Sequence, residues 1–226
     1  TFHGTVVRKE FADTYPEVVE GYLTATLEAQ KWIQDDPMNA AVKVSEWTGV
    51  EKEVLYLYFS QGGITTFEAS VKPEWVDALK YDHALLQREV GIPDLAFDRW
   101  IDDSYLRNAY ATAGMDYDAL AGTVVDTTPN NPAFAPAEIW FADKGIVSYD
   151  SVADMLAAEA STDEAVNATY VYDNLTGLKL FGKAAYLVKG ADGDVVAFLK
   201  KADSDKYIAE NGGTLVIREN AVAMAD

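Results

Sequence analysis

The spacing of hydrophobic residues changes once along this chain, and that change constrains the fold more than any other feature. In the first 122 residues, apolar side chains recur at spacings of three and four, the period of amphipathic helices. From residue 137 onward they alternate, which is typical of half-buried strands. The stretch between contains Pro129, Pro132 and Pro136. Because proline lacks a backbone N–H, we expect a linker at 123–136, between a helical region at 1–122 and a strand-rich domain at 137–226, in an α+β fold.

Five helices are predicted in the first region, and the longest has the clearest start. Thr14 and Glu17 form a capping-box pattern, with Pro16 in the first turn, where its missing N–H costs nothing. An apolar stripe then follows one side of the helix, and we expect that side to pack against a partner surface. The stripe consists of Val18, Tyr22, Ala25, Ala29, Trp32 and Ile33. The other predicted helices cover residues 38–47, 51–59, 73–90 and 103–113.

The second region repeats one order of elements twice. Its first half predicts two strands, a helix and a strand, at 138–141, 146–149, 151–160 and 168–172. Its second half predicts the same order at 184–188, 195–199, 204–211 and 214–218. Two ββαβ units of similar length indicate an internal duplication.

Charge and composition exclude several classes of function. The 37 acidic and 18 basic residues give a formal net charge of −19, which repels phosphate backbones and anionic lipid surfaces, so no nucleic-acid partner is expected. The chain has no cysteine, which excludes disulfides, thiolate metal sites and cysteine nucleophiles. No run approaches the ~20 apolar residues of a membrane span. We also find no convergent nucleophile and base, and predict no catalytic residues.

The first region resembles a known family of transport proteins. The matching residues are Val6-Val7-Arg8-Lys9-Glu10-Phe11-Ala12, Tyr15-Pro16-Glu17-Val18-Val19, Leu27-Glu28-Ala29, Trp32 and Thr48-Gly49. They resemble the carboxyl-terminal region of nitrate/sulfonate/taurine-type solute-binding proteins of ABC transporters. The resemblance implies part of a periplasmic-binding-protein lobe, a small anionic solute, an ABC permease as partner and a periplasmic or other extracytoplasmic location. Either the sequence is a fragment, with a segment upstream of Thr1 removed, or the segment has been reused as a helical module.

The second region resembles the NosL accessory lipoproteins of nitrous oxide reductase maturation. The matching residues are Ala137-Glu138-Ile139-Trp140-Phe141, Tyr149-Asp150-Ser151, Asp154-Met155-Leu156, Ala168-Thr169-Tyr170-Val171-Tyr172-Asp173, Ala184-Ala185-Tyr186-Leu187-Val188, Ala197-Phe198 and Ala209-Glu210-Asn211-Gly212-Gly213. The resemblance implies copper handling. The family's cysteine- and methionine-containing motif precedes the first strand, where this chain has Asn130-Asn131-Pro132-Ala133-Phe134-Ala135. Cu(I) favours sulfur ligands, so copper ligation at that position is not expected here.

Two sets of residues remain as candidate binding groups. His3 near the amino terminus could bind Cu(II), and three methionines could supply thioethers to Cu(I), although methionine more often fills gaps in a core. These methionines are Met115, Met155 and Met224. Aromatic residues could line a small-molecule groove or simply pack in the core. The candidates for a groove are Trp47, Tyr58, Trp75 and Trp100.

Taken together, these features predict a non-catalytic, extracytoplasmic solute-binding component, or a fragment of one, linked to ABC-type uptake of a small anion such as nitrate or an organic sulfonate. Its NosL-like domain would be an appended binding or interaction module. The alternative is a copper-handling accessory protein of the NosL type. The sequence leaves the oligomeric state open, and no resident cofactor is expected.

Overall fold

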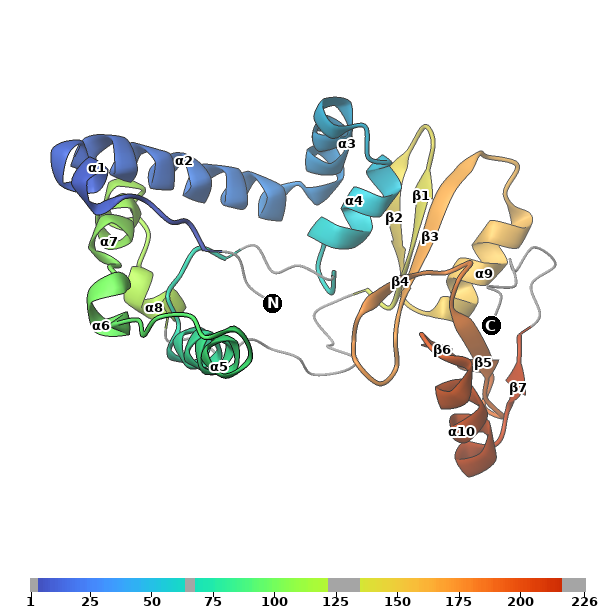
Figure 1. Cartoon of the computed structure of the whole chain (residues 1–226). Helices are drawn as coiled ribbons and strands as arrows, with labels where there is room; N and C mark the ends of the chain where they lie inside the picture. Colours follow the sequence, from blue (N-terminus) through green and yellow to red (C-terminus); the bar gives the residue numbers. More distant parts are fainter. Residues whose placement is uncertain (1–3, 64–67, 122–134, 217–226) are drawn as a thin grey trace. The chain divides into compact units, whose positions relative to one another are not determined.

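The computed structural model describes residues 4–63, 68–121 and 135–216, and it has the predicted α+β fold (Figure 1). The chain divides into two compact units, a helical one and a strand-rich one. The helical unit comprises Thr1–Trp32 and Phe67–Val125, and the strand-rich unit comprises Ile33–Thr66 and Asp126–Asp226. No helix in the described ranges combines the length and the apolar character that crossing a bilayer requires. The linker predicted at 123–136 lies almost entirely outside the described residues.

The helical unit is built on part of α2 and on five shorter or more exposed helices. Its elements are α1 (Lys9–Thr14), most of α2 (Pro16–Asp35), α5 (Pro73–Val90), α6 (Phe97–Trp100), α7 (Ser104–Thr112) and α8 (Tyr117–Ala121). A small core gathers between α2, α7 and α8, from Leu27, Leu106, Ala109, Tyr110 and Tyr117. In contrast, α5 has no buried residue. The helical unit therefore buries little of its apolar surface.

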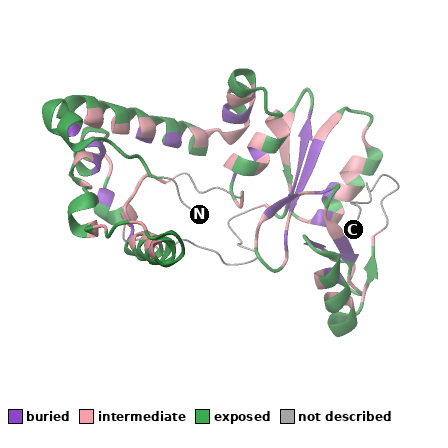
Figure 2. Ribbon diagram, in the orientation of Figure 1, coloured by how far each residue is buried: buried purple, intermediate pink, exposed green. Residues whose placement is uncertain are grey.

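The side of α2 that packs is not the predicted one. Leu27 is 1% exposed and Gln30 is 8% exposed, whereas Val18 and Tyr22 are 50% and 59% exposed. Figure 2 shows exposed stretches of α2 alternating with buried and partly buried ones. Ala25, Ala29 and Trp32 are exposed as well, and only Ile33 of the predicted stripe is partly buried. The prediction was wrong because Leu23, Leu27 and Gln30 form a second stripe at the same spacing on the other side.

Helices α3 (Pro37–Thr48) and α4 (Lys52–Phe59) belong to the strand-rich unit, although they precede the proline-rich stretch. Asp36 caps α3 by accepting a hydrogen bond from the Asn39 N–H at 3.1 Å, and Gly49 ends it with a φ of 74°. These signals set the ends of a helix, but they carry no information about which sheet or helix it covers. The boundary between the two packed units therefore differs from the point in the sequence at which the hydrophobic spacing changes.

The strand-rich unit contains two antiparallel sheets of equivalent connectivity. The first comprises β1 (Ala137–Phe141), β2 (Gly145–Tyr149), β3 (Val166–Tyr172) and β4 (Lys179–Phe181), in the order β2-β1-β3-β4. The second comprises β5 (Tyr186–Lys189), β6 (Val195–Phe198) and β7 (Thr214–Leu215), in the order β6-β5-β7. Helices α9 (Val152–Ser161) and α10 (Lys201–Asn211) precede the last strand of each repeat. The predicted pair of ββαβ units is confirmed, and β4 is an additional strand that was not predicted.

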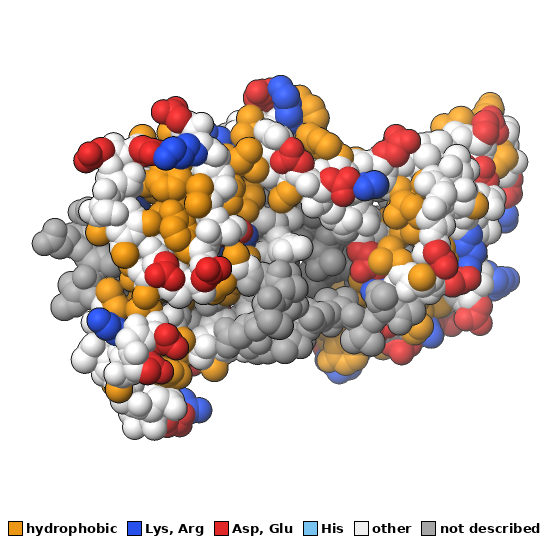
Figure 3. Space-filling view, turned by 180° about the vertical axis from the view of Figure 1, so that it is seen from behind, with side chains coloured by type: hydrophobic (Ala, Val, Ile, Leu, Met, Phe, Trp, Pro, Cys, Tyr) orange, Lys and Arg blue, Asp and Glu red, His pale blue; other side chains and the backbone are white. Residues whose placement is uncertain are grey.

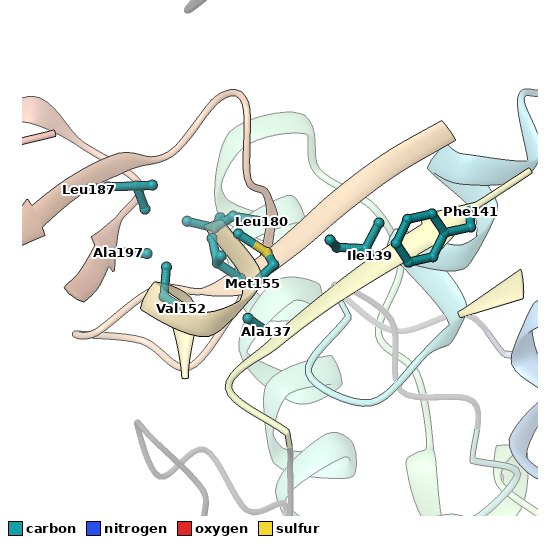
Figure 4. Close-up of a cluster of buried hydrophobic side chains, with 9 residues drawn as sticks. Ala137, Ile139, Phe141, Val152, Met155, Leu180, Leu187 and Ala197 are labelled. Carbon is teal, nitrogen blue, oxygen red and sulfur yellow. The ribbon is translucent and has the colours of Figure 1, made fainter. Parts of the chain in front are cut away.

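The first sheet is covered on both faces. On one face Ile139 and Phe141 join a core that includes Met155 of α9 and reaches Leu187 in the second sheet (Figure 4). On the other face Trp140 packs with residues of α3 and α4. All five residues of β1 are consequently buried. A charged residue inside this strand must therefore find a partner within the protein.

Candidate functional site

The most concentrated group of buried ionisable side chains in the strand-rich unit lies between α4 and the first sheet. Lys179 of β4 is 2% exposed, and its Nζ lies 2.8 Å from Oε2 of Glu138 in β1. The Lys179 amine also donates to Oγ of Ser60, just after α4, at 2.8 Å. The Tyr56 hydroxyl donates to the same Glu138 oxygen at 3.1 Å. Four side chains from three parts of the chain thus form one closed polar cluster.

Aromatic rings enclose the Lys179 amine. Its Nζ lies 4.6 Å from the ring centroid of Tyr56, 5.6 Å from that of Tyr170 and 5.3 Å from that of Tyr172. Such distances allow cation–π attraction, which is stronger where water is excluded. The rings therefore offset part of the cost of burying the lysine.

Burial shifts the pKa values of the cluster. It lowers the pKa of Lys179, and the adjacent Glu138 carboxylate opposes that shift. It raises the pKa of Tyr56, Tyr170 and Tyr172 well above 10.0, with the negative charge of Glu138 adding to the effect in each case. The tyrosines are therefore held neutral, as hydrogen-bond donors.

The end of α4 is attached to the sheet through the same residues. The backbone N–H of Lys179 donates to the carbonyl of Gly62 at 2.6 Å, and the Tyr172 hydroxyl donates to the carbonyl of Gln61 at 3.2 Å. Gly62 has a φ of 71°, and a Cβ there would collide with the Tyr172 ring. Only glycine fits this turn. The chemistry of the cluster is therefore that of an internal attachment, and its amine is not open to a substrate.

The helical unit has its own buried ion pair and an adjoining hydrogen-bond network. Lys72, fully buried, lies 3.0 Å from Glu68. Side chains from α2 and α7 bind the backbone of Ala69, since Gln30 Oε1 accepts from its N–H at 2.8 Å and the Tyr110 hydroxyl donates to its carbonyl at 2.6 Å. Burial raises the pKa of Tyr110 to about 12. This irregular segment, rather than a sheet, holds the helices together.

An open depression of about 420 Å³ lies at the end of α7 and the start of α8. Its lining is polar and comprises Arg107, Tyr110, Ala111, Gly114, Met115, Asp116, Tyr117 and Asp118. Arg107 is engaged by two carboxylates, at 3.0 Å from Asp103 and 2.7 Å from Asp118. The depression therefore has more acidic than basic groups in its wall, and its guanidinium is already paired.

The predicted groove aromatics are divided between the two units. Trp47 and Tyr58 belong to the strand-rich unit and are 71% and 42% exposed, whereas Trp75 and Trp100 belong to the helical unit. Within that unit Trp75 lies beside Lys72, with Nζ 5.5 Å from its ring centroid, and Trp100 contacts Phe97. None of these four contributes to the lining of the depression.

The two predicted copper ligands that the structure describes, Met115 and Met155, belong to different units. Met155 is fully buried in the apolar core beneath α9 (Figure 4), and Met115 lines the depression. His3 and Met224 lie outside the described residues. Within the described ranges there is no group of three or more His, Cys, Asp or Glu residues placed to hold a metal. On the face drawn in Figure 3, acidic side chains are scattered among basic ones.

The buried cluster was not predicted, although the sequence contains a signal for it. Glu138 is the single charged residue in the strand Ala137-Glu138-Ile139-Trp140-Phe141, and Lys179 stands between Leu178 and Leu180. Isolated opposite charges in two apolar runs are a pattern that predicts a buried ion pair.

Comparisons with known proteins identify no family for this chain. No family model matches it, and no curated protein matches it. Among solved structures, it is similar to the crystal structure of the copper chaperone NosL from Shewanella denitrificans, with 18% sequence identity and a TM-score of 0.34. The alignment covers 46% of this chain and 97% of that chain. Agreement with the NosL interpretation is thus weak, and nothing found supports the solute-binding-protein interpretation of the first region.

Proposed function

We propose that this chain is a non-catalytic, extracytoplasmic accessory protein that acts by binding, with the strand-rich unit as a NosL-like interaction module. The observation that supports the proposal is the closure of the Lys179 cluster. Its amine is 2% exposed, surrounded by three tyrosine rings and paired with Glu138. The buried ionisable groups of the Lys179 cluster therefore make their contacts inside the protein.

Native-state acylation of lysines, mapped by mass spectrometry, tests this closure. Lys179 is expected to be among the slowest amines to react, with Lys206 as an exposed control because its side chain is 73% exposed. Both should react at similar rates in denaturant. If Lys179 reacted as fast as Lys206 in the folded protein, the cluster would be an open site and the non-catalytic proposal would fail.

Copper handling is the second candidate, and one specific observation favours it. The thioether of Met115 borders an open depression that also presents Asp116, and a soft sulfur ligand suits Cu(I). Anaerobic Cu(I) titration against a competing chelator is the test. Under this candidate Met115→Leu weakens binding and Met38→Leu does not, because Met38, in α3, packs against the core of the strand-rich unit. Equal binding by both variants and the wild type would exclude Met115 as a ligand.

The finer assignment to ABC-type uptake rests on the sequence resemblance of the first region. A receptor for nitrate or an organic sulfonate needs an available cationic group, and Arg107 in the depression is already paired with two carboxylates. Isothermal titration with nitrate, taurine and a simple alkyl sulfonate tests this assignment directly. Binding that is lost in Arg107→Gln would support it, and an absence of binding heat for all three would reject it for this chain.

A further inference from the structure

A methionine lies at the contact between α3 and the turn of the first β-hairpin. Met38, in the first turn of α3, is partly buried and packs against the cluster that includes Tyr56, Trp140 and Tyr170. A Cβ built on Gly145, at the start of β2, would lie 2.9 Å from the Met38 sulfur. There is no room for one more atom between that sulfur and the glycine, so the thioether lies directly against the hairpin.

The methionines that the structure describes differ in their access to solvent. Met155 is fully buried beneath α9, whereas Met38 and Met115 are partly exposed. Met115 belongs to the helical unit and lines its open depression, away from any sheet. Within the described ranges, Met38 is therefore the methionine that is both open to a small reagent and packed between a helix and a sheet.

We propose that Met38 is an oxidation site, and that conversion of its thioether to the sulfoxide by a peroxide loosens α3 from the first sheet. In this step a lone pair of the sulfur attacks one oxygen of hydrogen peroxide, and the O–O bond breaks as the S–O bond forms. The second oxygen takes up a proton and the products are the sulfoxide and water. The sulfur is oxidised by two electrons and the peroxide is reduced.

The polarity of the sulfoxide is the reason that the packing should weaken. Oxidation turns a flexible apolar side chain into a polar one, and a polar group is costly to hold against apolar neighbours. Because Met38 lies at the surface of its cluster, the sulfoxide gains contact with water by moving away from it. Helix α3 also supplies the fully buried Ala41 to the same cluster, so a displaced α3 exposes the face of the sheet that carries Trp140. Peroxide is thereby coupled to the exposure of apolar surface, whatever the strand-rich unit binds.

Limited treatment of the full chain with hydrogen peroxide, with sulfoxides mapped by mass spectrometry and opening measured by hydrogen exchange, is the experiment. We expect Met38 and Met115 to be oxidised before Met155, and the amides of α3 to exchange about tenfold faster once Met38 is converted. In Met38→Leu, which keeps the size of the side chain but has no sulfur, peroxide should leave the exchange of α3 unchanged. Met115→Leu is the matched control and should retain the full effect.

A polar substitution provides a second measurement that needs no oxidant. Met38→Gln resembles the sulfoxide in length and polarity, and should speed the exchange of α3 about as much as oxidation does. Circular dichroism establishes that each variant keeps its helices and strands. The proposal is overturned if Met38 reacts as slowly as Met155, if oxidation of Met38 or Met38→Gln leaves the exchange of α3 unchanged, or if Met38→Leu is as sensitive to peroxide as the wild type.

Discussion

The two units of this chain secure their helices in different ways. In the strand-rich unit, α4 covers a sheet face and is attached to it by a buried ion pair, tyrosine hydroxyls and a backbone hydrogen bond. In the helical unit, α5 has no buried residue and α2 leaves an apolar side exposed. A sheet offers two flat faces to cover, whereas a few helices packed around an irregular segment bury only part of each surface. The strand-rich unit should therefore be the more stable of the two.

Removing the Glu138 carboxylate should reduce the difference in stability between the two units more than any other change proposed here. Glu138→Ala leaves Lys179 charged and buried without its partner, and should destabilise the strand-rich unit by about 3–5 kcal/mol. Denaturant unfolding, combined with native-state hydrogen exchange of β1 and β3, assigns the loss to that unit. The exposed pair between Lys144 and Glu164 provides the control, since Glu164→Ala should cost no more than about 1 kcal/mol.

Replacing both charged residues tests whether the ion pair stabilises the folded unit or contributes no net stability. In the double variant Glu138→Leu with Lys179→Met, much of the lost stability should return, because no unpaired charge remains buried. If Glu138→Ala cost as little as Glu164→Ala, the pair would be solvated in solution and the closed cluster would be contradicted.

Alkaline pH should weaken the strand-rich unit through its tyrosines. Because the folded-state pKa values of Tyr56, Tyr170 and Tyr172 are raised, their contribution is fully present below pH 10.0 and is lost as pH rises above it. Three such groups remove about 4 kcal/mol of stability per pH unit in that range. Lys179 acts in the opposite direction, since its lowered pKa favours the folded state as pH rises toward 10.5.

Near-ultraviolet absorbance of tyrosinate distinguishes the two units in this titration. Tyr110 of the helical unit, with a pKa of about 12, should ionise before the three tyrosines around Lys179, which should ionise only when their unit unfolds. Phenylalanine variants assign each transition. Ionisation of the three near pH 10 with the fold intact would contradict their burial.

A smaller effect should follow from Asp173, which joins the two repeats of the strand-rich unit. Its buried carboxylate accepts hydrogen bonds from the Leu199 N–H at 2.8 Å and from the N–H and hydroxyl of Thr176 at 2.9 and 2.6 Å. Asp173→Ala leaves these donors without partners and should cost about 2–3 kcal/mol in denaturant unfolding. Asp163→Ala, at an exposed position, should change stability by less than about 0.5 kcal/mol. Equal effects would show that Asp173 is not a link between the repeats.

Local signals predicted much of the fold. The capping pattern at Ser151 is confirmed, since its hydroxyl accepts from the Asp154 N–H at 3.0 Å, and Gly91 ends α5 with a φ of 72° as its position suggested. Alternating residues gave the strands of both repeats. The three-residue strand β4 was missed because it is too short for a periodic signal and contains a lysine.

Contacts between segments that lie far apart in the sequence were not predictable from local patterns. Lys179 and Glu138 are 41 residues apart, and Ser60 is a further 78 residues before Glu138, so no local spacing brings them together. Helix α3 carries caps that define its ends, but the packing of α3 and α4 on the first sheet depends on strands that come much later in the chain. The isolated charges of Glu138 and Lys179 indicate a buried pair, but their contacts with Tyr56 and Ser60 became apparent only in the folded unit.

The smallest predicted effect is that of Tyr22→Ala in α2, where two stripes at helical spacing compete for the place in the core. Leu27 is 1% exposed and lies in the helical core, so Leu27→Ala should cost about 2–4 kcal/mol. Tyr22 is 59% exposed, and Tyr22→Ala should change stability by no more than about 0.5 kcal/mol. Thermal unfolding of both variants measures the difference. A large loss for Tyr22→Ala would show that the predicted stripe, rather than the Leu27 side, forms the core.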